Sequence, residues 1–286
     1  MFRGRDNHRH EVVRIADSVA LAGNKAFPDT RIGVATTTRA IHFTLAMTPA
    51  GTEKGRSLAA LAAASDRLAA LVQSLSSADG AQQIPYLGWT VAETAAHVVT
   101  VAGRLLGDRR RSAVPEETGR LNAICLEELA DRDPTSLAAR LRTDMGLVIE
   151  RVYPKVDFDR AYPFHGSTTI SGGGGAAFLL CELLVHGHDI ASSTQRDWAI
   201  PAQEAAIAVR GPAEFWTRLL DAEGLPTFVV ELGEYTPVEF PVRSGTVDGG
   251  DRPATADAAE LLLAMFGRTV PSDERIATVL AALPQL

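Results

Sequence analysis

The sequence has little histidine, almost no cysteine and no long apolar run. The two cysteines, Cys125 and Cys181, are too few for a disulfide framework, so we expect reduced thiols and a cytoplasmic location. No apolar segment approaches the length of about 18 residues that a transmembrane helix requires. Charged residues interrupt the N-terminal segment where a signal peptide would need an apolar core. These absences argue against a disulfide-stabilised secreted scaffold and against an integral membrane protein.

Positive charge is also scarce in most of the chain, and the formal net charge is -7. Residues 1–46 contain seven Arg or Lys and four Asp or Glu, a balance of +3. Residues 47–286 contain 21 and 31 such residues, a balance of -10. An acidic body is poorly suited to binding phosphate backbones, so we expect no nucleic-acid partner. Apolar residues make up 46% and charged residues 22%, which is typical of a folded globular protein.

The length of 286 residues allows about two domains. Residues 1–46 lack a sustained apolar period, and residues 1–54 are predicted to be a flexible N-terminal extension. Residues 55–197 contain four or five helical segments with short links, which predicts an antiparallel four-helix bundle. Residues 198–286 combine helical and strand patterns, so we predict a small α+β domain. The predicted fold class is therefore mainly α.

Within the predicted α+β domain, one helix is expected over residues 201–220, strands over residues 227–232 and 238–242, and two further helices. A turn is expected at Gly233-Glu234 and another at Ser244-Gly245, since glycine and polar residues mark the connections between strands.

The helix that contains His97 has a clear start signal. Thr90 is followed three residues later by Glu93, which is a capping box, so we assign Glu93 to the helix end and not to a metal. His97 lies in the middle of this helix between pairs of alanine and valine residues, so its ring is expected to face the core.

Four consecutive glycines, Gly172 to Gly175, precede the most apolar helix, which runs from Ala176 to about Ser192. They follow a polar loop and lack the Gly-Lys-Ser/Thr ending of a phosphate-binding loop, so we interpret them as a flexible hinge. Because the helix is apolar on nearly all sides, it is expected to be buried.

Two polar residues in this apolar helix, Glu182 and His186, share one face because they are four positions apart. A charged glutamate is almost never fully buried unless it is paired or bound to a cation. They either share a divalent metal ion or form a Glu–His hydrogen bond without metal. With His97 as a third ligand, we predict a metal site of His97, Glu182 and His186. Two histidines and one carboxylate leave a coordination position open, as in catalytic zinc sites and non-haem iron sites.

Other polar residues lie close to these ligands in the sequence. Asp189 is expected either to orient His186 or to make a structural bond at the helix end. We expect His188 to be a rim or hydrogen-bonding residue, and His165 is an alternative third ligand.

Two more residues have simpler expectations. Arg104 lies two turns after His97 and is expected either to hold a substrate carboxylate or to lie on the surface. Cys181 points away from the face of Glu182, so it is expected to be a packing residue.

Two segments of the sequence resemble the signature segments of the mycothiol-dependent maleylpyruvate isomerase family. They read Trp89-Thr90-Val91-x-Glu93-x-x-x-His97 and Glu182-Leu183-Leu184-Val185-His186-Gly187-x-Asp189-Ile190-Ala191. The resemblance covers about residues 55–286. It implies a DinB-like bundle that binds a divalent metal, usually zinc, at the same three residues, followed by a small α+β domain similar to sterol-carrier proteins.

The family resemblance also bears on the substrate pocket. The family commonly has an aromatic residue where this sequence has His188, so we expect either an altered pocket wall or an additional polar contact here. The family also uses an arginine from its second domain, for which Arg243 and Arg268 are the candidates.

The resemblance implies that the open metal position receives the sulfur of mycothiol or a related small thiol. The thiolate would add to a small electrophile, which gives isomerisation or S-transfer. Two other functions remain open, a metal-dependent hydrolase that uses metal-bound water and a non-catalytic metal- or thiol-binding protein. The expected partners are small molecules, with no nucleic acid or membrane, and the expected state is a monomer or homodimer.

Overall fold

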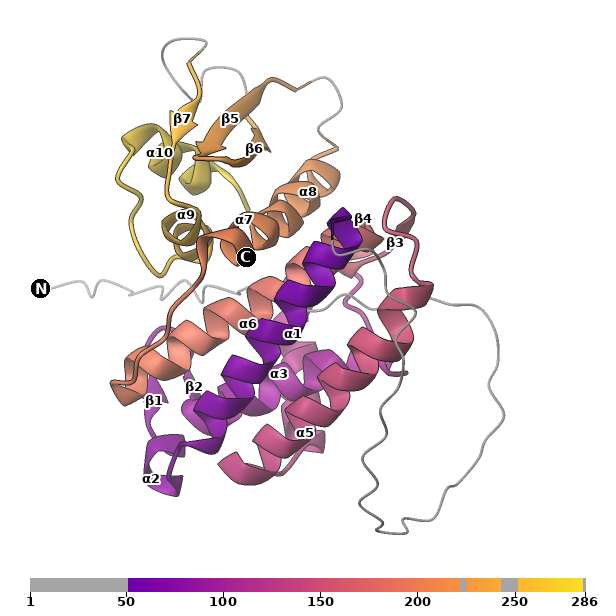
Figure 1. Cartoon of the computed structure of the whole chain (residues 1–286), viewed down its shortest axis with the longest axis vertical. Helices are drawn as coiled ribbons and strands as arrows, with labels where there is room; N and C mark the ends of the chain where they lie inside the picture. Colours follow the sequence, from indigo (N-terminus) through magenta and orange to yellow (C-terminus); the bar gives the residue numbers. More distant parts are fainter. Residues whose placement is uncertain (1–50, 222–224, 243–251, 285–286) are drawn as a thin grey trace, which may run out of the picture.

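The computed structural model describes residues 51–221, 225–242 and 252–284 (Figure 1). Its larger part is a bundle of four long helices. They are α1 (Glu53–Gln73), α3 (Val91–Leu105), α5 (Pro134–Leu147) and α6 (Gly172–Thr194). The prediction of a mainly α chain with a four-helix bundle and a smaller α+β part is confirmed. Most of the predicted N-terminal extension lies outside the described residues.

Helix α1 runs opposite to α3, and α5 runs opposite to α6, while α3 and α5 start at the same end of the bundle. The starts of α3 and α5 meet at this end, where Gly80 lies against both Ala92 of α3 and Pro134 of α5. The end of α6 returns to the same place, where Arg196 pairs with Asp79 at 3.1 Å. As a result α3 and α6 are antiparallel neighbours, and the two predicted signature segments face each other.

Short elements connect the bundle helices. They are α2 (Ser77–Gly80), β1 (Gln83–Ile84), β2 (Trp89–Thr90), a 3-10 turn (Pro115–Glu117), α4 (Thr118–Glu128), a π-helical turn (Val148–Val152), a 3-10 turn (Tyr153–Lys155), β3 (Ala161–Pro163), a 3-10 turn (His165–Ser167) and β4 (Thr169–Ser171). The region predicted as a polar loop before α6 thus contains the antiparallel pair β3–β4, in which Tyr162 lies opposite Ile170. Both of these side chains are buried, which explains why the segment is ordered.

The start of α6 corrects a prediction, because Gly172 to Gly175 form its first turn and not a hinge. Glycine is needed there because other segments approach closely, and a Cβ at Gly174 would overlap the carboxylate of Glu214 from α8. Glu214 accepts hydrogen bonds from the backbone N–H and the hydroxyl of Ser171, both at 2.7 Å. Its negative charge therefore lies at the N-terminus of α6, where the helix dipole favours it.

The C-terminal part begins with two helices, α7 (Ala202–Ala208) and α8 (Arg210–Leu219), where the sequence predicted one. The break has a covalent cause, since Pro212 has no N–H to donate to the carbonyl of Ala208 in a continuous helix. Phe215 of α8 packs on Phe178 of α6 with ring centroids 5.9 Å apart. The aromatic contact joins the two parts in one apolar core, and the predicted domain boundary at residues 197/198 stays a prediction.

A three-stranded sheet lies beyond α7 and α8, in the order β6-β5-β7 (Figure 1). Its strands and the two helices packed beside them are β5 (Thr227–Leu232), β6 (Tyr235–Pro241), β7 (Ala254–Thr255), α9 (Ala258–Met265) and α10 (Glu274–Ala282). The predicted turn at Gly233-Glu234 joins β5 to β6, with Gly233 at φ 64°, and the predicted turn at Ser244-Gly245 lies outside the described residues.

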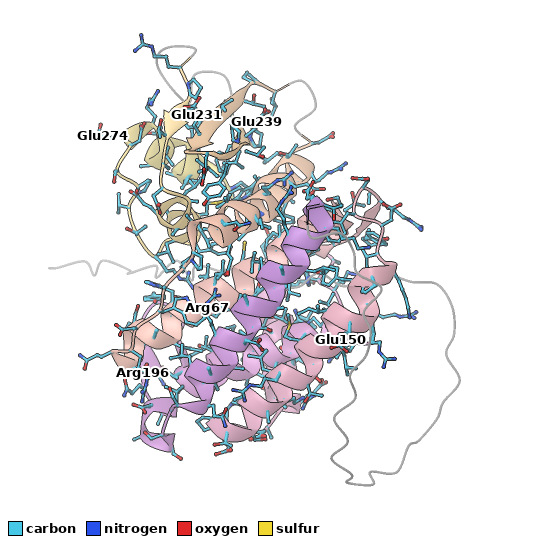
Figure 2. All side chains as sticks on the ribbon, in the orientation of Figure 1. Arg67, Glu150, Arg196, Glu231, Glu239 and Glu274 are labelled. Atoms are coloured by element: carbon cyan, nitrogen blue, oxygen red, sulfur yellow. The ribbon has the colours of Figure 1, made fainter. Side chains whose placement is uncertain are left out.

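The surface of this part is acidic, in line with the charge balance. Figure 2 shows Glu231, Glu239 and Glu274 around the outside of the sheet and α10. All three residues are exposed. In the ranges that the structure describes, no helix is both long enough and apolar enough to cross a membrane.

Candidate metal centre

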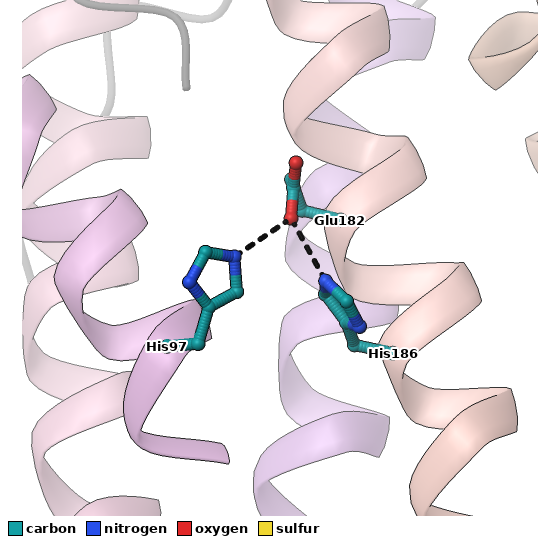
Figure 3. A group of neighbouring side chains, drawn as sticks. All are labelled: His97, Glu182 and His186. Carbon is teal, nitrogen blue, oxygen red and sulfur yellow. Dashed lines mark ion pairs between the residues drawn. The ribbon is translucent and has the colours of Figure 1, made fainter. Parts of the chain in front are cut away.

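The three predicted ligands meet in the middle of the bundle. Glu182 and His186 lie one turn apart on α6, and His97 faces them from α3 (Figure 3). One oxygen of Glu182 lies 3.2 Å from His186 Nε2 and 3.4 Å from His97 Nε2. The three residues are only 0–4% exposed. The site is therefore a buried cluster of two imidazoles and one carboxylate.

The spacing of the ligand atoms suits a small ion. One ligand atom from each of His97, Glu182 and His186 lies within 4.8 Å of the other two. Ligand atoms at about 2.0–2.2 Å from a tetrahedral zinc ion lie about 3.3–3.6 Å from one another. The observed carboxylate-to-imidazole distances of 3.2 and 3.4 Å are close to that edge length and long for a charge-assisted hydrogen bond. Apart from the imidazoles, no donor among the described residues hydrogen-bonds the carboxylate.

Asp189 fixes which nitrogen of His186 faces Glu182. Its carboxylate lies 3.1 Å from His186 Nδ1, and an ionised carboxylate only accepts, so Nδ1 carries the hydrogen. In a neutral imidazole Nε2 then presents its lone pair to the carboxylate of Glu182. Two lone pairs at 3.2 Å repel each other unless a proton or a cation lies between them. The residues thus fit a divalent ion, which would be held by His97, Glu182 and His186.

The pKa shifts of the metal-free cluster follow from the same contacts. Burial opposes the charged form of His186, but its bonds to Asp189 and Glu182 outweigh burial and raise the pKa of His186 to about 9. Burial also disfavours ionised Glu182, yet the two histidines hold the pKa of its carboxyl below the usual value. Without metal, a proton on His186 therefore takes the place of the cation.

Asp189 is itself held by residues from two other segments. Arg268, which follows α9, donates from Nε to one carboxylate oxygen at 2.9 Å and from Nη2 to the other at 2.7 Å. Tyr86, between β1 and β2, donates its hydroxyl to Asp189 at 2.9 Å. Burial disfavours ionised Asp189, but the contacts to Arg268 and His186 outweigh it and lower its pKa well below the usual range. Asp189 is therefore a fixed anion that orients a ligand, one of the two predicted roles.

Two tryptophans shape the surroundings of the ligands. The ring of Trp89 lies 4.9 Å from that of His97. Trp198 donates its indole N–H to the carbonyl of Leu184 at 3.0 Å, and a Cβ at Gly187 would overlap its ring. The glycine beside His186 is thus required by the close approach of Trp198.

Some predicted site residues lie elsewhere. His165 is buried, but it hydrogen-bonds Ser112 and not the metal cluster, so it is no third ligand. Arg104 is 2% exposed and donates to Asn122 at 2.7 Å, so the prediction of a surface arginine is wrong. Arg243 lies outside the described residues.

The remaining assignments agree with the structure. Glu93 and Thr90 form the predicted capping box. Cys181 is buried and donates to the carbonyl of Ala208, as expected of a packing residue. His188 is half-buried with its Nε2 3.4 Å from the hydroxyl of Ser192.

Sequence reasoning missed Tyr86 and Trp198. Both act from irregular segments, and neither has a spacing relation to the ligands that a sequence pattern would reveal. The Gly187 that follows His186 was the available signal, since a glycine inside an apolar helix indicates a close approach by another segment.

The fold and the site together define a class of protein, a DinB-like four-helix bundle with a buried cluster of two histidines and one glutamate. Residues 61–191 match the family model described as the mycothiol maleylpyruvate isomerase N-terminal domain, and this part of the chain belongs to that family. The match includes all three residues of the cluster. No curated protein and no solved structure matches the chain.

Proposed function

We propose that this protein is a metal-dependent enzyme that uses a metal-bound small thiol, such as mycothiol, for isomerisation or S-transfer on an electrophilic small molecule. The observation that carries the proposal is the convergence of His97, Glu182 and His186 on one point in the interior of the bundle. Membership of residues 61–191 in the mycothiol maleylpyruvate isomerase family supports the choice of thiol.

The charge of the site favours a thiolate. A divalent ion held there would lower the pKa of a thiol placed beside it, so that the thiolate forms near neutral pH. Glu182 contributes one negative charge and the two histidines bind as neutral imidazoles, so the loaded site keeps a net charge of about +1. Burial of the three side chains strengthens this effect, because a low-dielectric interior screens charge poorly.

The cysteines of the chain itself do not suit the role of nucleophile. Burial and the neighbouring charge of Glu182 raise the pKa of Cys181 well above its usual value. Cys125 is also buried, beside Arg104 and away from the ligand cluster. A nucleophilic sulfur therefore has to come from a small thiol that binds to the protein.

The residues around the ligands contribute orientation. Asp189 accepts the Nδ1 hydrogen of His186 and leaves Nε2 free to bind an ion. Trp89 lies against the ring of His97 and limits its rotation. Two histidines and a carboxylate are the protein ligands of an open site, and zinc is the metal we expect.

A turnover assay tests the function. Zinc-loaded protein is mixed with a cis-configured activated alkene acid, with and without added mycothiol, and consumption and isomerisation are followed. We expect turnover that requires both the metal and the thiol, and that His186→Ala abolishes. Metal-dependent cleavage of activated esters without thiol would instead establish a hydrolase. A thiol-induced change in the spectrum of cobalt-loaded protein with no consumption of electrophile would establish a binding protein.

A further inference from the structure

The contact between Arg268 and Asp189 joins the C-terminal part of the chain to the ligand helix. It is bidentate, with distances of 2.9 and 2.7 Å, and its side chains are 3% and 0% exposed. The guanidinium carbon also lies 5.0 Å from the ring centroid of Tyr86, which donates to the same aspartate. Among the described residues, the guanidinium group of Arg268 is thus held by Asp189 and Tyr86 inside the protein.

The end of α9 directs Arg268 toward the bundle. Gly267 adopts φ 69°, a left-handed conformation that glycine tolerates best. The N–H of Gly267 donates to the carbonyl of Ala264, and that of Arg268 to the carbonyl of Leu263 at 2.8 Å. This is the Schellman pattern that ends a helix and turns the chain sharply. The turn places the arginine side chain against α6.

A second arginine pair in the same part of the chain has the same geometry without the connection to the site. Arg275 contacts Asp273 from Nε at 3.1 Å and from Nη2 at 2.7 Å. Its side chains are 35% and 23% exposed, and Asp273 caps α10. Of these two pairs, only the Arg268 pair reaches the metal cluster, because its Asp189 lies 3.1 Å from Nδ1 of the ligand His186.

We propose that Arg268 is a positioning residue of the metal centre. It fixes Asp189, which fixes the ring of His186 with Nε2 toward Glu182. The C-terminal part thereby completes a site whose three ligands all lie in the bundle. The proposal rests on the proposed function, since it requires that the cluster binds a divalent ion. Residues that orient a metal-binding histidine typically contribute about 10- to 100-fold to metal affinity.

The affinity of the purified full chain for Co²⁺ tests this role. It is measured by competition with a chelator, and the visible absorption of the bound cobalt reports the coordination geometry. We expect Arg268→Ala to weaken binding about 10-fold or more and to shift the cobalt bands. The matched control, Arg275→Ala, is expected to stay within about twofold of wild type, because exposed pairs contribute little.

A double-mutant cycle separates positioning from a general structural role. Asp189→Asn is expected to weaken cobalt binding, and adding Arg268→Ala to it is expected to change the affinity by less than about twofold, because Arg268 acts through Asp189. Independent, additive losses in affinity would contradict the proposal. So would cobalt bands in Arg268→Ala that are identical to those of wild type.

Folding is checked by circular dichroism of the metal-free variants. If Arg268→Ala does not fold, Arg268→Lys, which keeps the charge but loses the fork, and Tyr86→Phe take its place. Arg268→Lys is expected to weaken cobalt binding at least threefold, and wild-type affinity in both replacements would overturn the proposal. Wild-type protein that binds no metal would overturn the proposed function together with it. Wild-type binding that survives Arg268→Ala would overturn only the role of Arg268.

Discussion

Two buried histidines, His165 and His186, differ in the groups that surround their ring nitrogens. His165, 1% exposed, accepts at Nδ1 from the backbone N–H of Ser112 at 3.2 Å and lies 2.8 Å from the hydroxyl of the same residue. That hydroxyl lies 2.7 Å from the hydroxyl of Thr118. These contacts at Nδ1 involve neutral groups, and none of them brings a buried carboxylate to the imidazole.

The other cluster has a buried carboxylate, and the orientation of His186 turns a lone pair toward it. A proton or an ion has to compensate the negative charge of this carboxylate. The comparison teaches that burial of a histidine alone does not indicate a metal. A metal is indicated when one histidine nitrogen faces a buried carboxylate and the other nitrogen is held by a fixed anion.

Removal of the metal is expected to give the largest difference between the clusters. An ion that binds only the folded state stabilises it by about 4 kcal/mol when its free concentration is about 1,000 times Kd. Chelator treatment should therefore lower the unfolding temperature of zinc-loaded wild type. His165→Ala should show the same lowering from its own starting temperature. Superimposable unfolding curves with and without chelator would contradict a metal in the bundle.

The pH dependence of metal binding is the second way to distinguish the His186 cluster from the His165 cluster. With the pKa of His186 raised to about 9, this histidine is protonated at neutral pH in the metal-free protein and must lose that proton to bind an ion. Apparent affinity should therefore fall as the pH is lowered, by about tenfold per pH unit between pH 8 and pH 6. Chelator competition at several pH values measures this slope. An affinity that does not change with pH would exclude His186 as a ligand.

Loss of His165 is expected to have a smaller effect, confined to stability. The change His165→Ala leaves the Ser112 N–H without its buried acceptor, which typically costs about 1–3 kcal/mol. Denaturant unfolding measures this cost, and the metal content should equal that of wild type. A loss of metal in His165→Ala would instead mean that the two clusters are coupled.

The sequence predicted the ligand cluster because its signals are local. The four-residue spacing of Glu182 and His186 puts them on one helix face, and the capping box at Thr90 placed His97 within a helix. The bundle was predictable for the same reason, since apolar periodicity marks each of its helices.

Contacts between distant segments were not predictable. The glycine run at the start of α6 indicated flexibility, yet it permits the close approach of Glu214, which lies 40 residues after Gly174. Arg104 was misjudged because its burial depends on α4 and the partner Asn122. The role of Arg268 depends on a helix end that turns it toward α6, and sequence spacing carries no information on that docking.

The central claim, that His97, Glu182 and His186 hold one divalent ion, is tested most directly by metal content. Wild-type protein, His97→Ala, His186→Ala and the control His165→Ala are purified under identical conditions, and the metal bound per chain is determined. We predict close to one ion per chain in wild type and in His165→Ala, and very little in the other two variants. Near-stoichiometric metal in both His97→Ala and His186→Ala would contradict the assignment.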